Sequence, residues 1–409
     1  LVVSIIIFFF FCVLLFRLFM ELEDQTWYLY LLLAMFNIIY LLNNLEFWGL
    51  AALLFDVRQS KRLFAVVSAG DIPAKMVGYL LAVALIPVIG TENLLWVALA
   101  CLLLSLFIFK PLRKHEAINE FEDTHHVKHG GSKYIYDISI AISGNKLIRH
   151  AAMVSFFSFC CLIVVNFVFY GYVKHAFSTD KSLAGFFAIF LAVVRAITMI
   201  IKITITNKMA DRIGLKASLL ITPVLLVLIT LIAVIYIPPE TTHGNGEKTT
   251  FYLFGVLAIV TDVLRSAIQS PVLLATMQPL PAHQRLKGHT IIKGLTDPFA
   301  FMSMGILLLI IPLHEGVTDF RLLCYILLGL LSFWILYVNL INNSYLKALS
   351  SAIRNRTLNG TQISITDKES LDVLLEKLKT GNESEAFSVL QLIATQKTWK
   401  KEFFEAALL

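Results

Sequence analysis

The sequence predicts an all-α protein: a polytopic bundle of membrane-spanning helices followed by a short helical segment outside the membrane. Three observations predict this class. Hydrophobic residues make up 58% of the 409 residues and charged residues only 15%, whereas a soluble domain is about half apolar and a quarter charged. Apolar runs long enough to cross a bilayer alternate with short polar joints. Every second joint is basic, which indicates the cytoplasmic side because Lys and Arg resist translocation.

The apolar runs define about ten spans, since roughly 20 apolar residues cross a hydrocarbon core about 30 Å thick. The basic joints lie at 56–63, 110–149, 202–216 and 285–293, and the joints between them are acidic or mixed. The expected spans are 1–19, 27–54, 64–89, 94–109, 150–173, 182–204, 216–237, 251–277, 288–312 and 321–341.

The longest joint divides these spans unevenly, with four before it and six after it. Residue 1 is Leu and already lies in an apolar run, so we expect two more spans upstream and a six-plus-six arrangement in the intact protein. The expected parts are a first half at 1–109, a cytoplasmic central loop at 110–149, a six-span second half at 150–341 and a cytoplasmic tail at 342–409.

An internal repeat supports the two-half arrangement. A basic loop around Lys61 enters a span and is followed by Gly70, and the same order recurs around Arg285 and Gly294. Both pairs are separated by the same offset (285 − 61 and 294 − 70, each 224). Two halves related by parallel repetition are typical of the major facilitator architecture.

A second loop resembles the short loop signature of that superfamily, Asp-Arg-x-Gly-x-Lys. It runs from Asp211 and Arg212 through Gly214 to Lys216. The glycine permits a tight turn between adjacent helices, and the charged side chains can pair with neighbouring helix ends and stabilise one gating state. The alternative interpretation is an ordinary basic inner loop.

Ionisable side chains inside spans are the first candidates for a transport site, because a charge in the bilayer is costly. Arg195 lies near the middle of its span, which holds no acidic residue. Its guanidinium must face a cavity or a partner, and its planar fork suits phosphate or carboxylate. Arg265 faces the cavity or is neutralised by Asp262, three residues earlier. The expected substrate-contacting residues are Arg195, Arg265, Glu46, Asp262, Asn44, Asn166 and Tyr170.

Other charges in the spans are expected to act in gating. Asp71 and Lys75 are four residues apart, as are Lys293 and Asp297, and this spacing lets side chains pair on a helix. Lys293 lies near a span end, where snorkelling is the alternative. The expected gating residues are Asp71, Lys75, Asp211, Arg212, Lys293 and Asp297.

The sequence contains no phosphate-binding loop, nucleophile–base constellation or dinucleotide-binding loop. We therefore expect neither an enzyme nor an ATP-driven pump, and no cofactor. His125, His126 and His129 lie in a polar, glycine-containing linker, so we expect no metal site. The net charge of +6 comes with no basic stripe interleaved with aromatic residues, so no nucleic-acid partner is expected.

The tail predicts short amphipathic helices. Thr366 and Glu369 have the spacing of a capping box, and leucines at 371, 374, 375 and 378 follow with helical periodicity. A second helix is marked by Phe387, Leu390 and Ile393. Paired short helices resemble HEAT-type repeats, which need at least three units, so we expect more repeats after Leu409 and a soluble protein partner. The alternative is a short helical tail of no special type.

Two segments resemble the non-mitochondrial ATP/ADP translocases, nucleotide transporters related to the major facilitators. The first is 55–64, followed by Gly70 and Gly78, and the second is 269–281, followed by Arg285 and Lys287. The resemblance implies exchange of ATP for ADP, or of a related nucleotide, by alternating access in a bacterial inner membrane. It also implies a transport role for Glu46. The eighth span departs from that family, because it contains Arg195 and no acidic residue, whereas the translocases have an intramembrane glutamate there.

Three functions remain open. The first is a secondary carrier of an anionic metabolite, a nucleotide in particular, in which Arg195 and Arg265 contact phosphates while Glu46 and Asp262 balance charge or gate. The second is a proton-coupled carrier of another small molecule, with Glu46 or Asp262 as the proton site. The third is a membrane anchor for a HEAT scaffold or sensor that transports nothing.

Overall fold

The computed structural model describes residues 2–19, 70–112, 144–177, 179–206, 213–236, 245–315 and 320–354, with isolated positions at 31, 34–36, 38–39, 42 and 389. Every regular element in these ranges is a helix, which confirms the all-α prediction. Seven of the described helices are long and apolar enough to cross a membrane, and two shorter apolar helices accompany them at Ile6–Leu18 and Leu94–Ile108. These nine correspond to nine of the ten expected spans, and most of the tenth, 27–54, lies outside the described residues.

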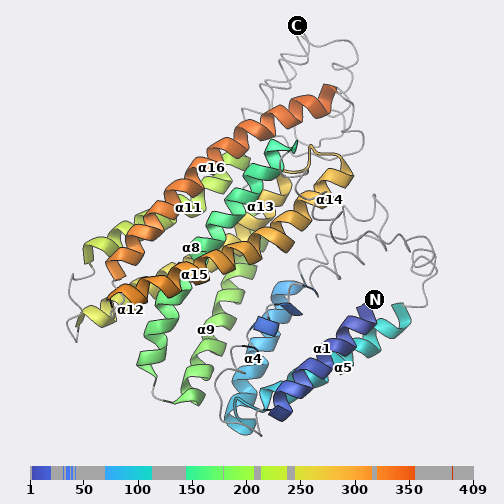
Figure 1. Cartoon of the computed structure of the whole chain (residues 1–409), viewed down its shortest axis with the longest axis vertical. Coiled ribbons are helices and arrows are strands. Elements are labelled where there is room, and N and C mark those ends of the chain that lie inside the picture. Colours follow the sequence, from blue (N-terminus) through green and yellow to red (C-terminus); the bar gives the residue numbers. More distant parts are fainter. Residues whose placement is uncertain are drawn as a thin grey trace. The chain divides into compact units, whose positions relative to one another are not determined.

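The chain divides into two compact units. The first contains residues Leu1–Gly131 and Phe177–Ala196, with helices α1 (Val2–Phe19), α4 (Asp71–Ile89), α5 (Leu94–Leu112) and most of α9 (Asp180–Ile201). Helix α5 packs against α1 and α4, and Figure 1 shows α1 and α5 side by side. Gly90 ends α4 with a positive φ of 82°, a conformation that glycine adopts without strain.

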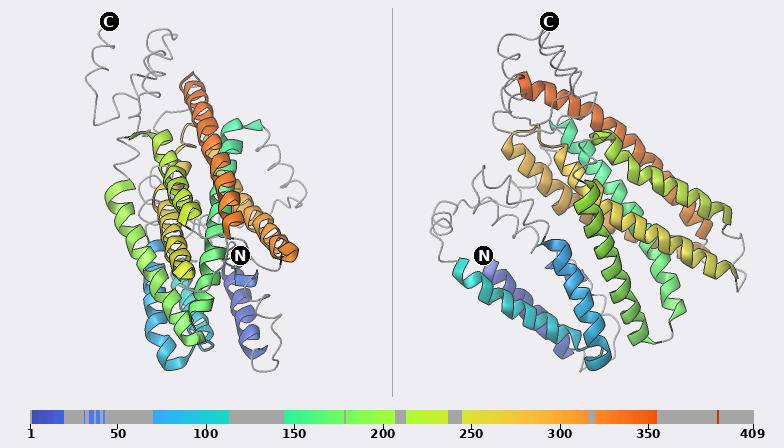
Figure 2. Two further views of the ribbon diagram at one scale, coloured as in Figure 1. Left: turned by 90° about the vertical axis from the view of Figure 1, so that its left-hand side faces the viewer. Right: turned by 180° about the vertical axis from the view of Figure 1, so that it is seen from behind.

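The second unit contains residues Ser132–Ala176 and Ile197–Leu409, and α8 (Lys146–Ala176) lies at its centre. Helices α12 (Asn245–Leu264), α15 (Asp297–Glu315) and α16 (Phe320–Arg354) all pack against α8. Helix α11 (Leu215–Tyr236) packs against α16 and α12. The two further views in Figure 2 show α16 running along α8 and α11.

The spacing of buried residues explains why α16 packs so extensively. Its fully buried side chains recur every three or four residues and so form one face; they include Leu327, Leu331, Trp334, Val338 and Ile341. Lipid is as apolar as these side chains, so close van der Waals packing, rather than exclusion of water, stabilises the contact. The helix continues to Arg354 without a break, past residue 341, where the expected span ends.

Two spans of the second unit depart from regular α-helix. A π-helical turn, η2 (Arg265–Gln269), joins α12 to α13 (Ser270–Ala275), and another, η3 (Ile291–Thr296), joins α14 (Ala282–Thr290) to α15. A third, η1 (Lys202–Thr206), follows α9. In η3 the Thr296 hydroxyl donates a hydrogen bond to the Ile291 carbonyl, five residues earlier, at 3.0 Å. The sequence predicted regular spans here, because apolar composition does not distinguish π from α turns.

Several sequence predictions lie outside the described residues. They are Asn44 and Glu46 of the expected span 27–54, Asp211 and Arg212 of the short loop, the central loop between 113 and 143, and the tail after Arg354 apart from residue 389. The backbone of Lys293 lies in η3, but its side chain is not among those described.

Candidate functional site

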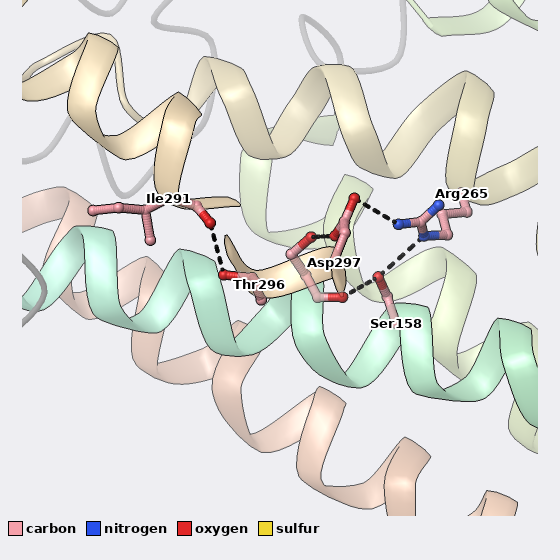
Figure 3. Close-up of polar contacts among 6 residues, drawn as sticks. Ser158, Arg265, Ile291, Thr296 and Asp297 are labelled. Atoms are coloured by element: carbon pink, nitrogen blue, oxygen red, sulfur yellow. Dashed lines mark hydrogen bonds and ion pairs between the residues drawn. The ribbon is translucent and has the colours of Figure 1, made fainter. Parts of the chain in front are cut away.

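Three helices of the second unit meet at an ion pair between Arg265 and Asp297. The Arg265 Nη2 atom lies 3.6 Å from Asp297 Oδ2, and both side chains are only 16% exposed. Arg265 begins η2, Asp297 begins α15 directly after η3, and α8 supplies the residues beside them. Figure 3 shows the two charged side chains pointing toward each other with Ser158 next to them.

Two serines of α8 contact both members of the pair. The Ser155 hydroxyl donates a hydrogen bond to Asp297 Oδ1 at 3.0 Å. The Ser158 hydroxyl accepts one from Arg265 Nε at 3.4 Å and donates its own hydrogen to the Ser155 carbonyl at 2.9 Å. Each charged group therefore has a hydroxyl partner from α8 as well as its counter-ion.

An aromatic ring covers one face of the Arg265 guanidinium. The Arg265 Cζ atom lies 4.4 Å from the centroid of the Phe159 ring, which is well within the range of a cation–π interaction. Phe159 in turn lies against Phe301 of α15, with the ring centroids 6.4 Å apart. The guanidinium is thus bounded by Phe159 on one face, Ser158 at Nε and Asp297 at Nη2.

The site lies deep within the helices that are long and apolar enough to cross a membrane. Arg265, Asp297 and Ser158 are each at least 10 residues from either end of their candidate spans (275 − 265 and 297 − 287 are the smallest separations). Ten helical residues correspond to about 15 Å, half of the hydrocarbon core. A lone charge at such a depth is expensive, and intramembrane charges pair with one another and mark pathways for ions or substrates.

A π-helical turn lies directly beside each residue of this ion pair. Arg265 is the first residue of η2, and Asp297 is the residue that follows η3. Single π turns inside α-helices occur frequently at functional sites, because the extra residue changes the direction in which the following side chains project. The regular α-helical periodicity assumed in the sequence analysis is therefore interrupted at the two charged residues of the site.

The structure changes the expected partner of Arg265. The sequence suggested Asp262 as the neutralising partner of Arg265 and Lys293 as the partner of Asp297. Arg265 instead pairs with Asp297, from another helix. The Lys293–Asp297 pair stays a prediction, because the Lys293 side chain is not among those described. Asp262 is half-buried on α12 and makes other contacts of its own.

Five other predicted residues lie in helices α4, α8 and α9. Asp71 and Lys75 form the expected pair near the start of α4, with Lys75 Nζ 2.9 Å from Asp71 Oδ2. Arg195 is half-buried in the first-unit part of α9 and has polar or electrostatic contacts. On α8, Asn166 is half-buried and Tyr170 is exposed.

Sequence reasoning missed Ser155, Ser158 and Phe159. Their spacing of three and four residues places them on one side of α8, which is a signal the sequence does contain. Isolated serines and phenylalanines are, however, ordinary in apolar spans, and only the approach of two other helices distinguishes these three.

Comparison with known protein families agrees with this arrangement of helices. A family profile described as the Major Facilitator Superfamily matches residues 1–293, well over half of the chain. No curated protein and no solved structure gives a significant match. The family profile, the apolar helices and the intramembrane charges agree in indicating a multi-pass membrane protein. The chain therefore belongs to the Major Facilitator Superfamily, whose members are secondary membrane transporters rather than enzymes.

Proposed function

We propose that this transporter carries an anionic small molecule by alternating access, and that nucleotides of the ATP and ADP class are its substrates. The observation that supports an anionic substrate is Arg265, a permanent cation deep in a span. Among the described residues it has a single carboxylate as ion-pair partner, Asp297 at 3.6 Å. Guanidinium groups are the usual partners of phosphate and carboxylate because their planar donors match two oxygens at once.

The nucleotide class rests on sequence. The segments 55–64 and 269–281 resemble the non-mitochondrial ATP/ADP translocases, and Arg195 adds a second cation within a span. In this proposal Arg265 and Arg195 contact phosphate groups, Glu46 and Asp262 balance charge, and Asn44, Asn166 and Tyr170 contribute polar contacts.

The test uses the full-length protein in liposomes loaded with ADP, with labelled ATP added outside. We expect ATP entry that depends on internal ADP and is abolished in Arg265→Gln and Arg195→Gln, both inserted normally. Lys181→Gln, which removes an exposed cation at the start of α9, is the matched control and retains exchange. Wild-type exchange in the Arg265→Gln variant would refute a role for that guanidinium in binding the anion.

A proton-coupled carrier is the second candidate, and Asp297 favours it. This carboxylate lies within a span and is bound by Ser155 and Arg265, so it is a group whose protonation would weaken the ion pair. Uptake that collapses with an uncoupler and persists without internal ADP would favour this candidate over exchange.

The other sequence-based assignments complete the proposal. The protein sits in a bacterial inner membrane with the central loop and the tail in the cytoplasm. Gating involves Asp71–Lys75, Asp211–Arg212 and Lys293, together with Asp297. The tail, 342–409, binds a soluble protein through HEAT-like helices. Deletion of 357–409 would then release a co-purifying partner without preventing insertion.

A further inference from the structure

The contacts of Arg265 divide its donors into two groups. A guanidinium has five N–H donors in a rigid plane. The Nε donor is used by Ser158 at 3.4 Å, and Nη2 is directed toward Asp297 at 3.6 Å. In the part of the chain that the structure describes, Nη1 makes no hydrogen bond or ion pair. The terminal edge, Nη1 with the second hydrogen of Nη2, is therefore the edge available to a ligand.

Helix α8 controls the orientation of that edge. Phe159 covers one face of the guanidinium with its ring centroid 4.4 Å from Cζ, which prevents the group from tilting to that side. Ser158 holds Nε, so rotation about the end of the side chain would break a hydrogen bond to a charged donor. These two contacts come from adjacent residues on a helix that is buried along much of its length.

Asp297 contacts Ser155 more closely than it contacts Arg265. Charge-assisted hydrogen bonds between nitrogen and oxygen are usually about 2.7–2.9 Å long, whereas the distance between Nη2 and Oδ2 here is 3.6 Å. The other carboxylate oxygen of Asp297 accepts a 3.0 Å bond from Ser155. The carboxylate thus binds Ser155 of α8 as well as Arg265, and its contact with Nη2 is longer than a direct charge-assisted hydrogen bond.

We propose that Ser158 and Phe159 are positioning residues that orient Arg265, so that its terminal edge binds a two-oxygen anionic group of the substrate. This inference rests on the proposed anion transport and goes beyond it by naming the recognised group and the residues that set its geometry. A phosphate and a carboxylate share the required pair of oxygens and a planar approach to the fork. The guanidinium therefore recognises the anionic group of the substrate by its shape as well as by its charge.

The experiment measures uptake of two labelled anions, ATP and citrate, into liposomes containing the full-length protein and loaded with the same unlabelled anion. ATP uptake identifies a phosphate group, and citrate uptake identifies a carboxylate. For whichever anion is transported, KM and the maximal rate are compared among Phe159→Leu, Phe159→Tyr, Ser158→Ala and Phe157→Leu. Phe157 is the matched control because it stacks on Phe333 and Tyr337 of α16, at 5.5 Å in each case.

Phe159→Leu removes the aromatic face and is expected to raise KM by about three- to thirtyfold, the range that corresponds to a cation–π contact, with a much smaller change in the maximal rate. Phe159→Tyr keeps the face and restores the wild-type KM. Ser158→Ala raises KM in the same direction, which keeps the inference testable if Phe159→Leu does not fold. Phe157→Leu leaves KM unchanged.

The possible failures are distinguishable. If the wild-type protein transports neither anion, the proposed function fails, and this inference fails with it. If the wild type transports one of them and both Phe159→Leu and Ser158→Ala keep its KM, the positioning role is refuted while anion transport stands. An equal rise of KM in Phe157→Leu would also refute it, because that result indicates general loosening of α8.

Discussion

The Arg265–Asp297 pair makes a quantitative prediction about stability. Replacing Asp297 by Asn keeps the shape of the side chain and removes its charge, so Arg265 is left with no counter-ion at 3.6 Å. At an effective dielectric constant of about 20, two unit charges at this distance attract each other by roughly 5 kcal/mol. Breaking one partner of a buried pair typically costs about 3–5 kcal/mol, because the remaining charge stays buried. We expect Asp297→Asn to lower the free energy of unfolding by about 3–5 kcal/mol.

The reasoning is tested by a double-mutant cycle. Arg265→Gln alone leaves Asp297 with Ser155 as its partner, whereas the double variant Arg265→Gln/Asp297→Asn removes both charges. We expect the double variant to be less destabilised than the sum of the single variants, by about 2–3 kcal/mol, the upper range for residues in direct contact.

The assay is reversible unfolding in mixed micelles with increasing denaturing detergent, followed by circular dichroism. All four proteins are measured at the same lipid and detergent composition. Effects that add to within about 0.5 kcal/mol would refute the reasoning, because independent sites show additivity of that quality.

Three further predictions concern other parts of the chain. Trp334 is fully buried on α16, so Trp334→Ala should lower the free energy of unfolding by about 3–5 kcal/mol in the same detergent titration; a loss below about 1 kcal/mol would contradict the packing. Asp71 is 60% exposed in its pair with Lys75, so Asp71→Asn should change the free energy of unfolding by less than about 1 kcal/mol. A loss comparable to that of Asp297→Asn would show that the pair is buried in the working protein. In single-cysteine variants studied in detergent, N-ethylmaleimide should label exposed Cys101 quickly and buried Cys161 only after unfolding. Labelling is measured by mass spectrometry, and equal rates at the two cysteines would contradict the burial of α8.

The predictions made from sequence succeeded where they depended on local properties. A span is recognisable because crossing the bilayer requires a certain length of apolar residues, and that requirement does not depend on which helices pack together. The Asp71–Lys75 pair was predictable for the same reason, since four residues along one helix always bring two side chains onto the same side.

The sequence by itself determined the class of protein, the approximate number of spans and the identity of the charged residues inside them. Only the tertiary structure decided how these charges pair. Arg265 and Asp297 come from different helices, and Ser158 is 107 residues from the arginine that it contacts. Their meeting depends on how three helices rotate against one another. The π turns η2 and η3 lie beside the two charged residues. An analysis based on regular helical periodicity offered Arg265 only a cavity or Asp262 of the same helix, and not a carboxylate from another helix.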